Sequence, residues 1–117
     1  MSTRSETNLT QEQLEDLRER LEDKQSRLAT ELKRLEEEEL PNLYREEESN
    51  DGYGDDAKND QIRQRIVAQI KRRRSDLQAV QAALGRMENG TYGLDQRTGD
   101  PIRFERLQAL PTARTAI

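Results

Sequence analysis

Residues 14–35 of this 117-residue chain, LEDLRERLEDKQSRLATELKRL, carry its clearest structural pattern. Its leucines form a single stripe: Leu14, Leu17, Leu21, Leu28, Leu32 and Leu35. The stripe repeats every seven residues, and nearly every position between the leucines is charged or polar. This pattern is typical of an amphipathic helix that packs its narrow apolar face on a partner helix. The stretch therefore predicts one long helix of a coiled coil.

Two local signals delimit this helix. Thr10 is a suitable N-cap, because Gln13 stands at the reciprocal position of a capping box. At the other end, Pro41 is expected to stop the helix, since proline has no N–H to donate and disfavours helix at the preceding residue. Residues 1–9 have no apolar period and are expected to form a flexible tail.

A second pattern predicts a second long helix, beginning near Asp55. Its apolar positions are mostly three or four residues apart: Ile62, Ile66, Ile70, Leu77, Val80, Leu84 and Met87. Asn89-Gly90 supplies the left-handed residue that commonly follows a helix. Two helices of similar length joined by a short polar segment pack most simply as an antiparallel hairpin. We expect that hairpin over residues 10–89, with an exposed acidic tip near 41–57.

The composition excludes several classes of function. With 38% charged and 31% hydrophobic residues, the chain cannot bury a thick globular core. The net charge of −4 disfavours autonomous DNA binding, and no apolar run is long enough for a membrane segment. We expect a soluble, cytoplasmic protein. Cysteine and histidine are absent, and carboxylates alone do not make a pocket for acid/base chemistry, so we predict no enzyme, no catalytic residue and no cofactor.

After Gly90 the helical period stops, and residues 90–117 are predicted to form a small C-terminal module. Turn signals occur at Gly93, at Thr98-Gly99-Asp100 and at Pro101. Its expected miniature core is Tyr92, Leu94, Ile102, Phe104 and Leu107. A module of this size must dock on the hairpin or be held by another interaction.

The module's motifs resemble those of the DksA/TraR family of RNA polymerase-binding regulators. The matching segments are Gly90-Thr91-Tyr92-Gly93, Thr98-Gly99 followed by Pro101-Ile102, Arg106-Leu107 with Ala109, and Pro111-Thr112-Ala113. The resemblance implies a mainly α fold, with two long helices in an antiparallel coiled-coil hairpin and a zinc-finger-like C-terminal module. It also implies that the hairpin enters the secondary channel of RNA polymerase, so that acidic tip residues approach the catalytic magnesium.

The family's tip pattern is Asp, two residues, Asp, one residue, Ala, and without gaps it falls on residues 52–57. Asp55 and Ala57 match, whereas Gly52 replaces the first Asp and Asp51 lies one position away. The resemblance therefore makes Asp51, Asp55, Asp56 and Ala57 the candidate partner-binding residues of the tip. A purely structural role is the alternative, in which Asp55 or Asp56 caps the second helix.

The family's module normally holds zinc with four cysteines. In this chain Asp95, Thr98 and Ala116 stand at three of those positions, and the fourth falls beyond Ile117. One carboxylate and one hydroxyl do not provide the ligand set of a structural zinc site. We therefore predict a degenerate, zinc-finger-like module without metal.

Basic residues offer further candidate contacts. Within Lys71-Arg72-Arg73-Arg74, which a helix spreads over all sides, Arg72 and Arg73 are candidate partner-binding residues, as is Arg106 near the base of the hairpin. The alternative is a solvated face or pairing within the helix, and at least one of the four must lie near the apolar seam, its stem covering apolar surface.

Together these features predict a monomeric, non-enzymatic transcription regulator whose partner is RNA polymerase. The alternative is a coiled-coil adaptor or a homo-oligomer, in which the leucine stripe pairs with a second chain.

Overall fold

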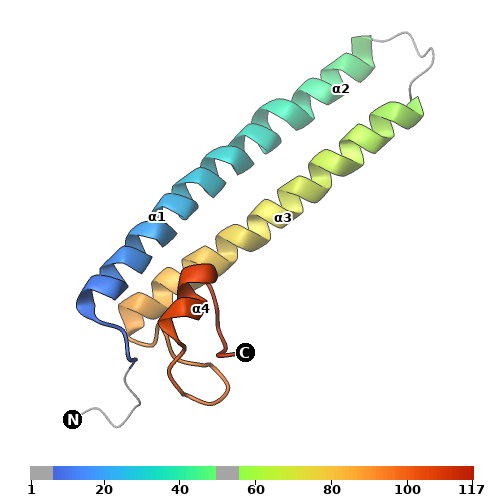
Figure 1. The fold of residues 1–117 in the computed structure, drawn as a ribbon. Coiled ribbons are helices and arrows are strands. Elements are labelled where there is room, and N and C mark those ends of the chain that lie inside the picture. The colour runs from blue at the N-terminus through green and yellow to red at the C-terminus, as the bar shows by residue number, and fades with distance from the viewer. Residues whose placement is uncertain (1–6, 50–55) are drawn as a thin grey trace. The chain divides into compact units, whose positions relative to one another are not determined.

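The computed structural model describes residues 7–49 and 56–117, which form a mainly α-helical chain (Figure 1). Its helical elements are α1 (Gln11–Arg34), the π-helical turn η1 (Leu35–Glu39), α2 (Leu40–Ser49), α3 (Asp56–Asn89) and α4 (Phe104–Ala109). The one β-type pairing among the described residues is an isolated bridge between Leu94 and Pro101. None of the described helices combines the length and the apolar character needed to cross a membrane. The mainly α prediction is confirmed.

The chain divides into two compact units. The central unit is Ser26–Leu77, and the terminal unit combines Met1–Gln25 with Gln78–Ile117. In the central unit the end of α1, η1 and α2 run antiparallel to the first part of α3, and in the terminal unit the first part of α1 runs antiparallel to the end of α3. This confirms the predicted antiparallel pairing of two long helical arms.

Helix α1 begins at the predicted capping box. The Gln13 backbone N–H donates to Thr10 Oγ1 at 3.1 Å, and the Thr10 backbone N–H donates to Gln13 Oε1 at 2.9 Å. These two bonds give partners to backbone donors that a bare helix end would leave without one.

The prediction that the first helical arm ends at Pro41 is wrong. The arm passes through the wide turn η1, where the Leu40 N–H donates to the Leu35 carbonyl, and continues as α2 to Ser49. Pro41 is thereby the second residue of a new α-helical segment, and proline is tolerated in the first turn of a helix. The wide turn also changes the register, because a step of five residues from Leu35 to Leu40 stays on one face in a π-helix but not in an α-helix.

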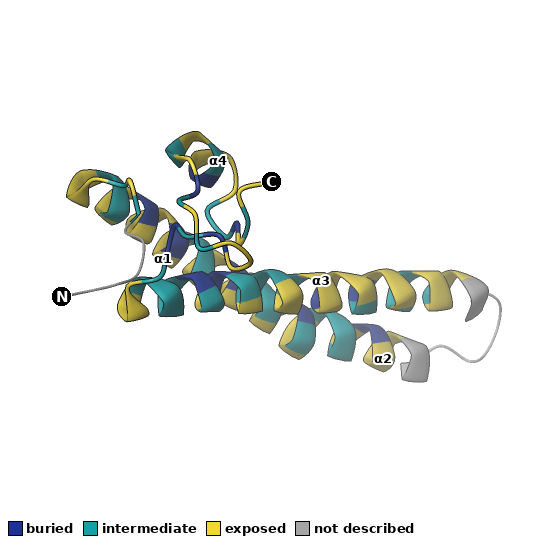
Figure 2. Ribbon diagram, turned by 90° about the horizontal axis from the view of Figure 1, so that it is seen from below, coloured by how far each residue is buried: buried dark blue, intermediate teal, exposed yellow. Residues whose placement is uncertain are grey.

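The extra length of this arm completes the apolar core of the central unit. Its buried members are Leu35, Leu43, Ile66 and Ile70, and Leu32, Leu40 and Ile62 pack against them. Figure 2 shows buried positions on the sides of the helices that face one another. Of the leucine stripe, Leu28 is also buried in this unit. The predicted seam is therefore confirmed, and α2 extends it with two leucines.

The terminal unit buries residues from both arms and from the C-terminal module. They are Leu17, Leu21, Val80, Ala83, Tyr92, Ile102, Leu107 and Ala113. Tyr92, Ile102 and Leu107 thus belong to the core as predicted, whereas Leu94 and Phe104 are only half-buried. Within the segment predicted as a flexible tail, Thr7 and Leu9 lie against the Cα of Gly93, where a β-carbon would come within 2.7 Å of Thr7 Oγ1. Residues 7–9 therefore contact Gly93 of the C-terminal module, and the flexibility of the tail stays a prediction.

Helix α3 ends as its sequence predicts. Gly90 has a φ of 75°, the Gly90 N–H donates to the Met87 carbonyl at 3.3 Å, and the Thr91 N–H donates to the Arg86 carbonyl at 2.9 Å. This pair of bonds is a Schellman motif, which requires a left-handed residue after the helix. The turn directs the chain into the C-terminal module.

Truncation of Leu35 tests the apolar core of the central unit. Leu35 is 1% exposed, so Leu35→Ala should lower the free energy of unfolding by about 2–5 kcal/mol through lost burial and a residual cavity. The matched control Leu110→Ala makes the same chemical change at a side chain that is 43% exposed, and should cost less than about 0.5 kcal/mol. Urea denaturation followed by circular dichroism measures both. Equal effects of the two substitutions would contradict the packing described above.

Candidate functional surfaces

Part of the acidic tip predicted near 41–57 lies outside the described residues. Asp51 and Asp55 fall in the segment 50–55, which the structure does not describe. Asp56 is the first residue of α3 and Ala57 the second, and the description does not extend to their side chains. Because α2 reaches Ser49, residues 41–49 of the predicted tip are helical. The role of the four tip residues therefore stays a prediction.

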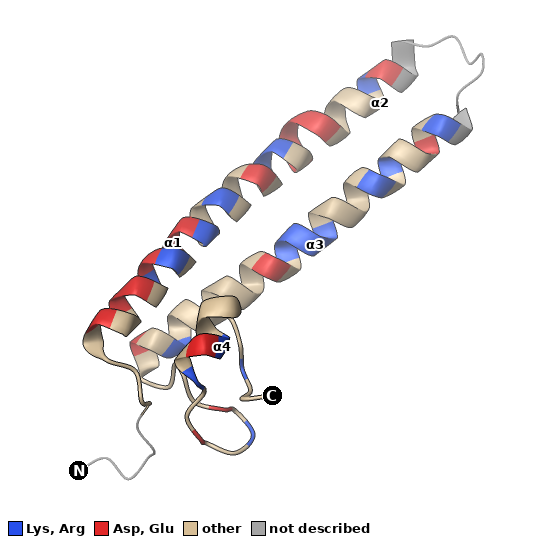
Figure 3. Ribbon diagram, viewed as in Figure 1, with Lys and Arg blue, Asp and Glu red and all other residues tan. Residues whose placement is uncertain are grey.

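Charge is unevenly distributed over the helices of the central unit (Figure 3). The turn η1 carries four consecutive glutamates, Glu36 to Glu39. The part of α3 in this unit carries the basic run Lys71-Arg72-Arg73-Arg74, of which Arg74 pairs with η1, and also Lys58, Arg63 and Arg65. Opposite charges on neighbouring antiparallel helices favour interhelical pairing in this register.

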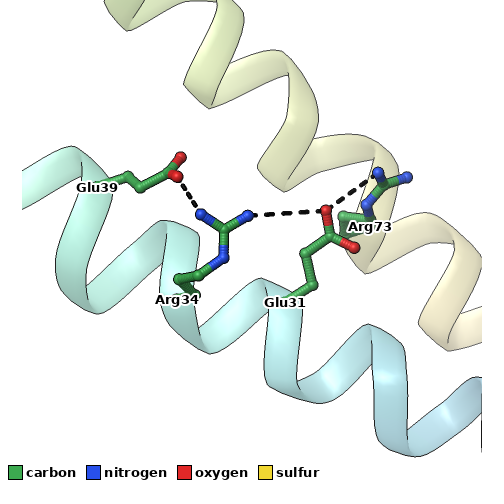
Figure 4. Close-up of polar contacts among 4 residues, drawn as sticks. All are labelled: Glu31, Arg34, Glu39 and Arg73. Atoms are coloured by element: carbon green, nitrogen blue, oxygen red, sulfur yellow. Dashed lines mark hydrogen bonds and ion pairs between the residues drawn. The ribbon is translucent and has the colours of Figure 1, made fainter.

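Two arginines of the basic run form these interhelical pairs. Arg73 Nη2 lies 3.2 Å from Glu31 Oε1, and Figure 4 shows Arg34 between that carboxylate and Glu39. Arg74 donates to Glu36 from Nε at 2.9 Å and from Nη2 at 2.6 Å. The Arg73 side chain is 31% exposed, which confirms that one member of the run lies near the seam. Pairs this exposed contribute about 0.2–1 kcal/mol each, so they help to set register more than stability.

The three basic candidates have different surroundings. Arg73 is held by Glu31, and Arg106 donates from Nε to the Thr115 carbonyl at 2.7 Å within the terminal unit. Arg72 is exposed and makes no hydrogen bond or ion pair with any residue that the structure describes. Arg72 is therefore the candidate whose guanidinium is available to an outside partner.

A cation–π contact in the central unit escaped sequence reasoning. The Arg63 guanidinium lies 5.2 Å from the centre of the Tyr44 ring, and Arg63 also binds Asp60 at 2.6 Å. Tyr44 lies beyond Pro41, in the part of the arm that was not expected to be helical. A helix that ends at Pro41 would not bring Tyr44 to Arg63, so the sequence did not predict this contact.

The C-terminal module is closed by hydrogen bonds around the loop 95–100. The Asp95 N–H donates to the Asp100 carbonyl at 2.7 Å, and the Ile102 N–H donates to the Gly93 carbonyl at 2.7 Å. Tyr92 is buried, and its hydroxyl donates to the Pro111 carbonyl at 2.8 Å. Burial is the main reason that the pKa of Tyr92 rises to about 12, and the tyrosine therefore stays neutral at physiological pH.

Asp95 is the buried polar side chain of this module, with 5% of its surface exposed. Its Oδ1 accepts backbone N–H bonds from Arg97 at 2.7 Å and from Thr98 at 3.3 Å. Its Oδ2 accepts the backbone N–H of Ala116 at 2.8 Å. The hydrogen bond from Ala116, and then the one from Arg97, hold the pKa of this carboxyl below its ordinary value of 3.8.

The residues at the family's zinc positions do not fit a metal ion. Both Asp95 oxygens already accept backbone N–H groups, and the Thr98 hydroxyl accepts the Asp100 N–H at 3.2 Å. Ala116 has no ligating atom in its side chain. Within residues 7–49 and 56–117 no group of three or more acidic side chains is arranged to hold a metal. A structural zinc site needs four nitrogen, sulfur or oxygen ligands in a tetrahedron, and this arrangement does not supply them.

The depressed pKa of Asp95 predicts an acid-dependent loss of stability. A carboxyl whose pKa is lower in the folded state stabilises the fold above its unfolded pKa, and that contribution disappears as pH falls through the folded value. The stability difference between the wild type and Asp95→Asn should therefore be constant above the ordinary value of 3.8 and shrink below it. Chemical denaturation of both proteins between pH 7 and pH 2 measures this difference. A difference that grows on acidification would contradict the assigned hydrogen bonds.

Comparison with known proteins gives sequence relatives but no matching family model. The chain is 32% identical over 87 residues to the RNA polymerase-binding transcription factor DksA of Caulobacter vibrioides (strain NA1000 / CB15N), which covers 74% of this chain and 61% of that protein. It is 51% identical over 43 residues to the uncharacterized protein YlyA of Bacillus subtilis (strain 168), which covers 37% of this chain and 35% of that protein. The chain thus spans less than two thirds of either relative.

The fold is similar to a solved structure over most of its length. The transcription factor DksA2 from Pseudomonas aeruginosa superposes with a TM-score of 0.77 at 28% sequence identity. The match covers 90% of this chain and 78% of that one.

Proposed function

We propose that this chain, which is similar to DksA proteins in sequence and fold, is a non-enzymatic transcription regulator that binds RNA polymerase. The observation that carries the proposal is the likeness to a solved transcription factor over 90% of the chain. A relative 32% identical over 87 residues is named as an RNA polymerase-binding transcription factor. The proposal places the protein in the cytoplasm, where its partner works.

In the proposed mechanism the end of the hairpin enters the secondary channel of the polymerase. Asp51, Asp55 and Asp56 would then bring carboxylates close to the metal-bound active centre, with Ala57 beside them. A charge has a stronger effect in a water-poor channel than in bulk solvent, because the local dielectric is lower. Such carboxylates can alter the electrostatics of the active centre or the folding of the trigger loop.

The arginines of the two units would have different roles in such an insertion. The pairs Arg73–Glu31 and Arg74–Glu36 join α3 to α1 and η1, which keeps the two arms in register. Arg72 remains available, and we assign it to an acidic surface of the polymerase outside the active centre. Arg106 supports the C-terminal module through its bond to Thr115, so its contribution to binding would be indirect.

Binding and transcription assays with matched charge variants test the proposal. The tip variant is Asp51→Asn with Asp55→Asn, and the control is Glu37→Gln with Glu38→Gln, which removes the same charge from exposed positions of η1. All three proteins should bind polymerase core enzyme. The wild type and the control should alter transcription from a promoter that forms a short-lived open complex, and the tip variant should lose most of that effect.

Two results would contradict this proposal. If the wild type failed to bind polymerase at low and moderate salt, RNA polymerase would not be its partner. If the tip variant and the Glu37/Glu38 control affected transcription equally, the tip carboxylates would not cause the effect. The proposal that the protein binds polymerase would still stand.

Arg72→Gln tests the basic contact. Loss of one exposed, unpaired charge should weaken polymerase binding, chiefly through slower association, and the difference from wild type should diminish as salt is raised. Lys33→Gln is the control, because it removes an exposed charge from α1. Surface plasmon resonance at two salt concentrations gives both rates. Identical association rates for the two variants would show that Arg72 has no special role.

The alternative of a homo-oligomeric coiled coil has less support from the packing. Leu17, Leu21, Leu28 and Leu35 are buried within a single chain, and Leu14 and Leu32 are half-buried, so most of the stripe is already covered. We therefore propose a monomer. Sedimentation velocity should give one concentration-independent species of about 13.6 kDa. A dimer that persists on dilution would favour the alternative.

A further inference from the structure

The buried carboxylate of Asp95 occupies an unusual position for a charged group. Among the described residues, Asp95 is the one polar or charged residue that is buried, with 5% exposure. No described lysine or arginine lies within ion-pair distance of its carboxylate. A buried anion is costly unless hydrogen-bond donors replace its lost water. Here those donors are three backbone N–H groups, from Arg97, Thr98 and Ala116.

These three donors belong to two separate parts of the module. Arg97 and Thr98 lie in the same loop as Asp95 and bind Oδ1, which makes a local turn. Ala116 is 21 residues further along the chain and binds Oδ2. Beside this contact, the Gln96 N–H donates to the Arg114 carbonyl at 2.9 Å. The carboxylate is therefore a junction between the loop 95–100 and the last residues of the chain.

We propose that the Asp95 carboxylate closes the C-terminal module in place of a metal ion. A structural metal fixes a small fold by binding side chains from segments that are distant in sequence. The carboxylate achieves the same connection with the opposite sign of charge, since an anion binds N–H groups where a cation binds thiolates. Of the residues whose N–H groups it binds, Thr98 and Ala116 stand, like Asp95 itself, at cysteine positions of the resembled family.

The two oxygens explain why aspartate is needed at this position. Asparagine has the same size, but its amide offers one acceptor oxygen and one NH₂ group. In one orientation the NH₂ group would face the Ala116 N–H, and in the other it would face the N–H groups of Arg97 and Thr98. Either orientation places donor against donor and breaks one half of the junction, whereas the carboxylate serves both halves.

The closure has a chemical consequence for the whole module. Its fold depends on one carboxylate and not on thiols or a bound cation, and the full sequence has neither cysteine nor histidine. Chelators and thiol oxidants should therefore leave the module intact. Removal of the carboxylate should open the contact between the loop 95–100 and the C-terminal residues.

Amide hydrogen exchange of the full-length protein tests this closure residue by residue. The variants are Asp95→Asn and Asp95→Ala, and the control is Asp100→Asn, which removes an exposed carboxylate from the same loop. In Asp95→Ala the amides of Arg97, Thr98 and Ala116 should all exchange about tenfold faster or more, since hydrogen bonds to charged groups are strong. In Asp95→Asn either the Ala116 amide or the Arg97 and Thr98 amides should accelerate. Asp100→Asn should match the wild type.

Two outcomes would overturn the proposal. One is exchange at Ala116, Arg97 and Thr98 that is the same in Asp95→Asn, Asp95→Ala and the control. The other concerns metal binding. We expect neither EDTA nor added ZnCl₂ to change the thermal unfolding midpoint of the wild type. A midpoint that falls with EDTA, or rises with zinc, would show that a cation closes the module.

Discussion

The narrow apolar seam of the central unit sets the register of its two helical arms. A chain with 38% charged residues has little apolar surface to bury, so its two arms must align their leucines and isoleucines closely. Leu35, Leu43, Ile66 and Ile70 meet in that seam. Once they are aligned, the charged side chains project outward, and the pairs from Arg73 and Arg74 to the opposite arm follow from the same register.

Much of this arrangement could be predicted because its signals are local. The Thr10 capping box, the seven-residue leucine period and the turn at Gly90 each depend on residues a few positions apart. The continuation past Pro41 could not be predicted, because it depends on a π turn whose register is favoured by packing of Leu40 and Leu43 on the other arm. Proline is a stop signal in most helix interiors, and the apolar residues beyond Pro41 show their role only when the opposite arm is in place.

The C-terminal module shows a different limit of sequence reasoning. Asp95, Thr98 and Ala116 were identified as replacements for cysteines, which predicts what is missing but not what takes its place. The bond between Asp95 and the Ala116 amide joins residues 21 positions apart through a backbone donor, and no side-chain pattern marks it. A carboxylate that seemed an incomplete metal ligand is instead well supplied with hydrogen-bond partners. The sequence therefore identifies the positions of Asp95, Thr98 and Ala116, and only the fold shows that hydrogen bonds to the Asp95 carboxylate connect them.

The central functional claim is that the segment joining the two arms reaches the active centre of RNA polymerase. Site-specific photo-crosslinking tests it most directly, with a photoreactive amino acid in place of Tyr53 and, as a second probe, in place of the exposed Gln108 of α4. We expect the probe at position 53 to form adducts with the polymerase regions that surround the catalytic magnesium, and the probe at position 108 to form none with those regions. Adducts at position 53 only with other copies of this chain, or none with polymerase, would contradict it.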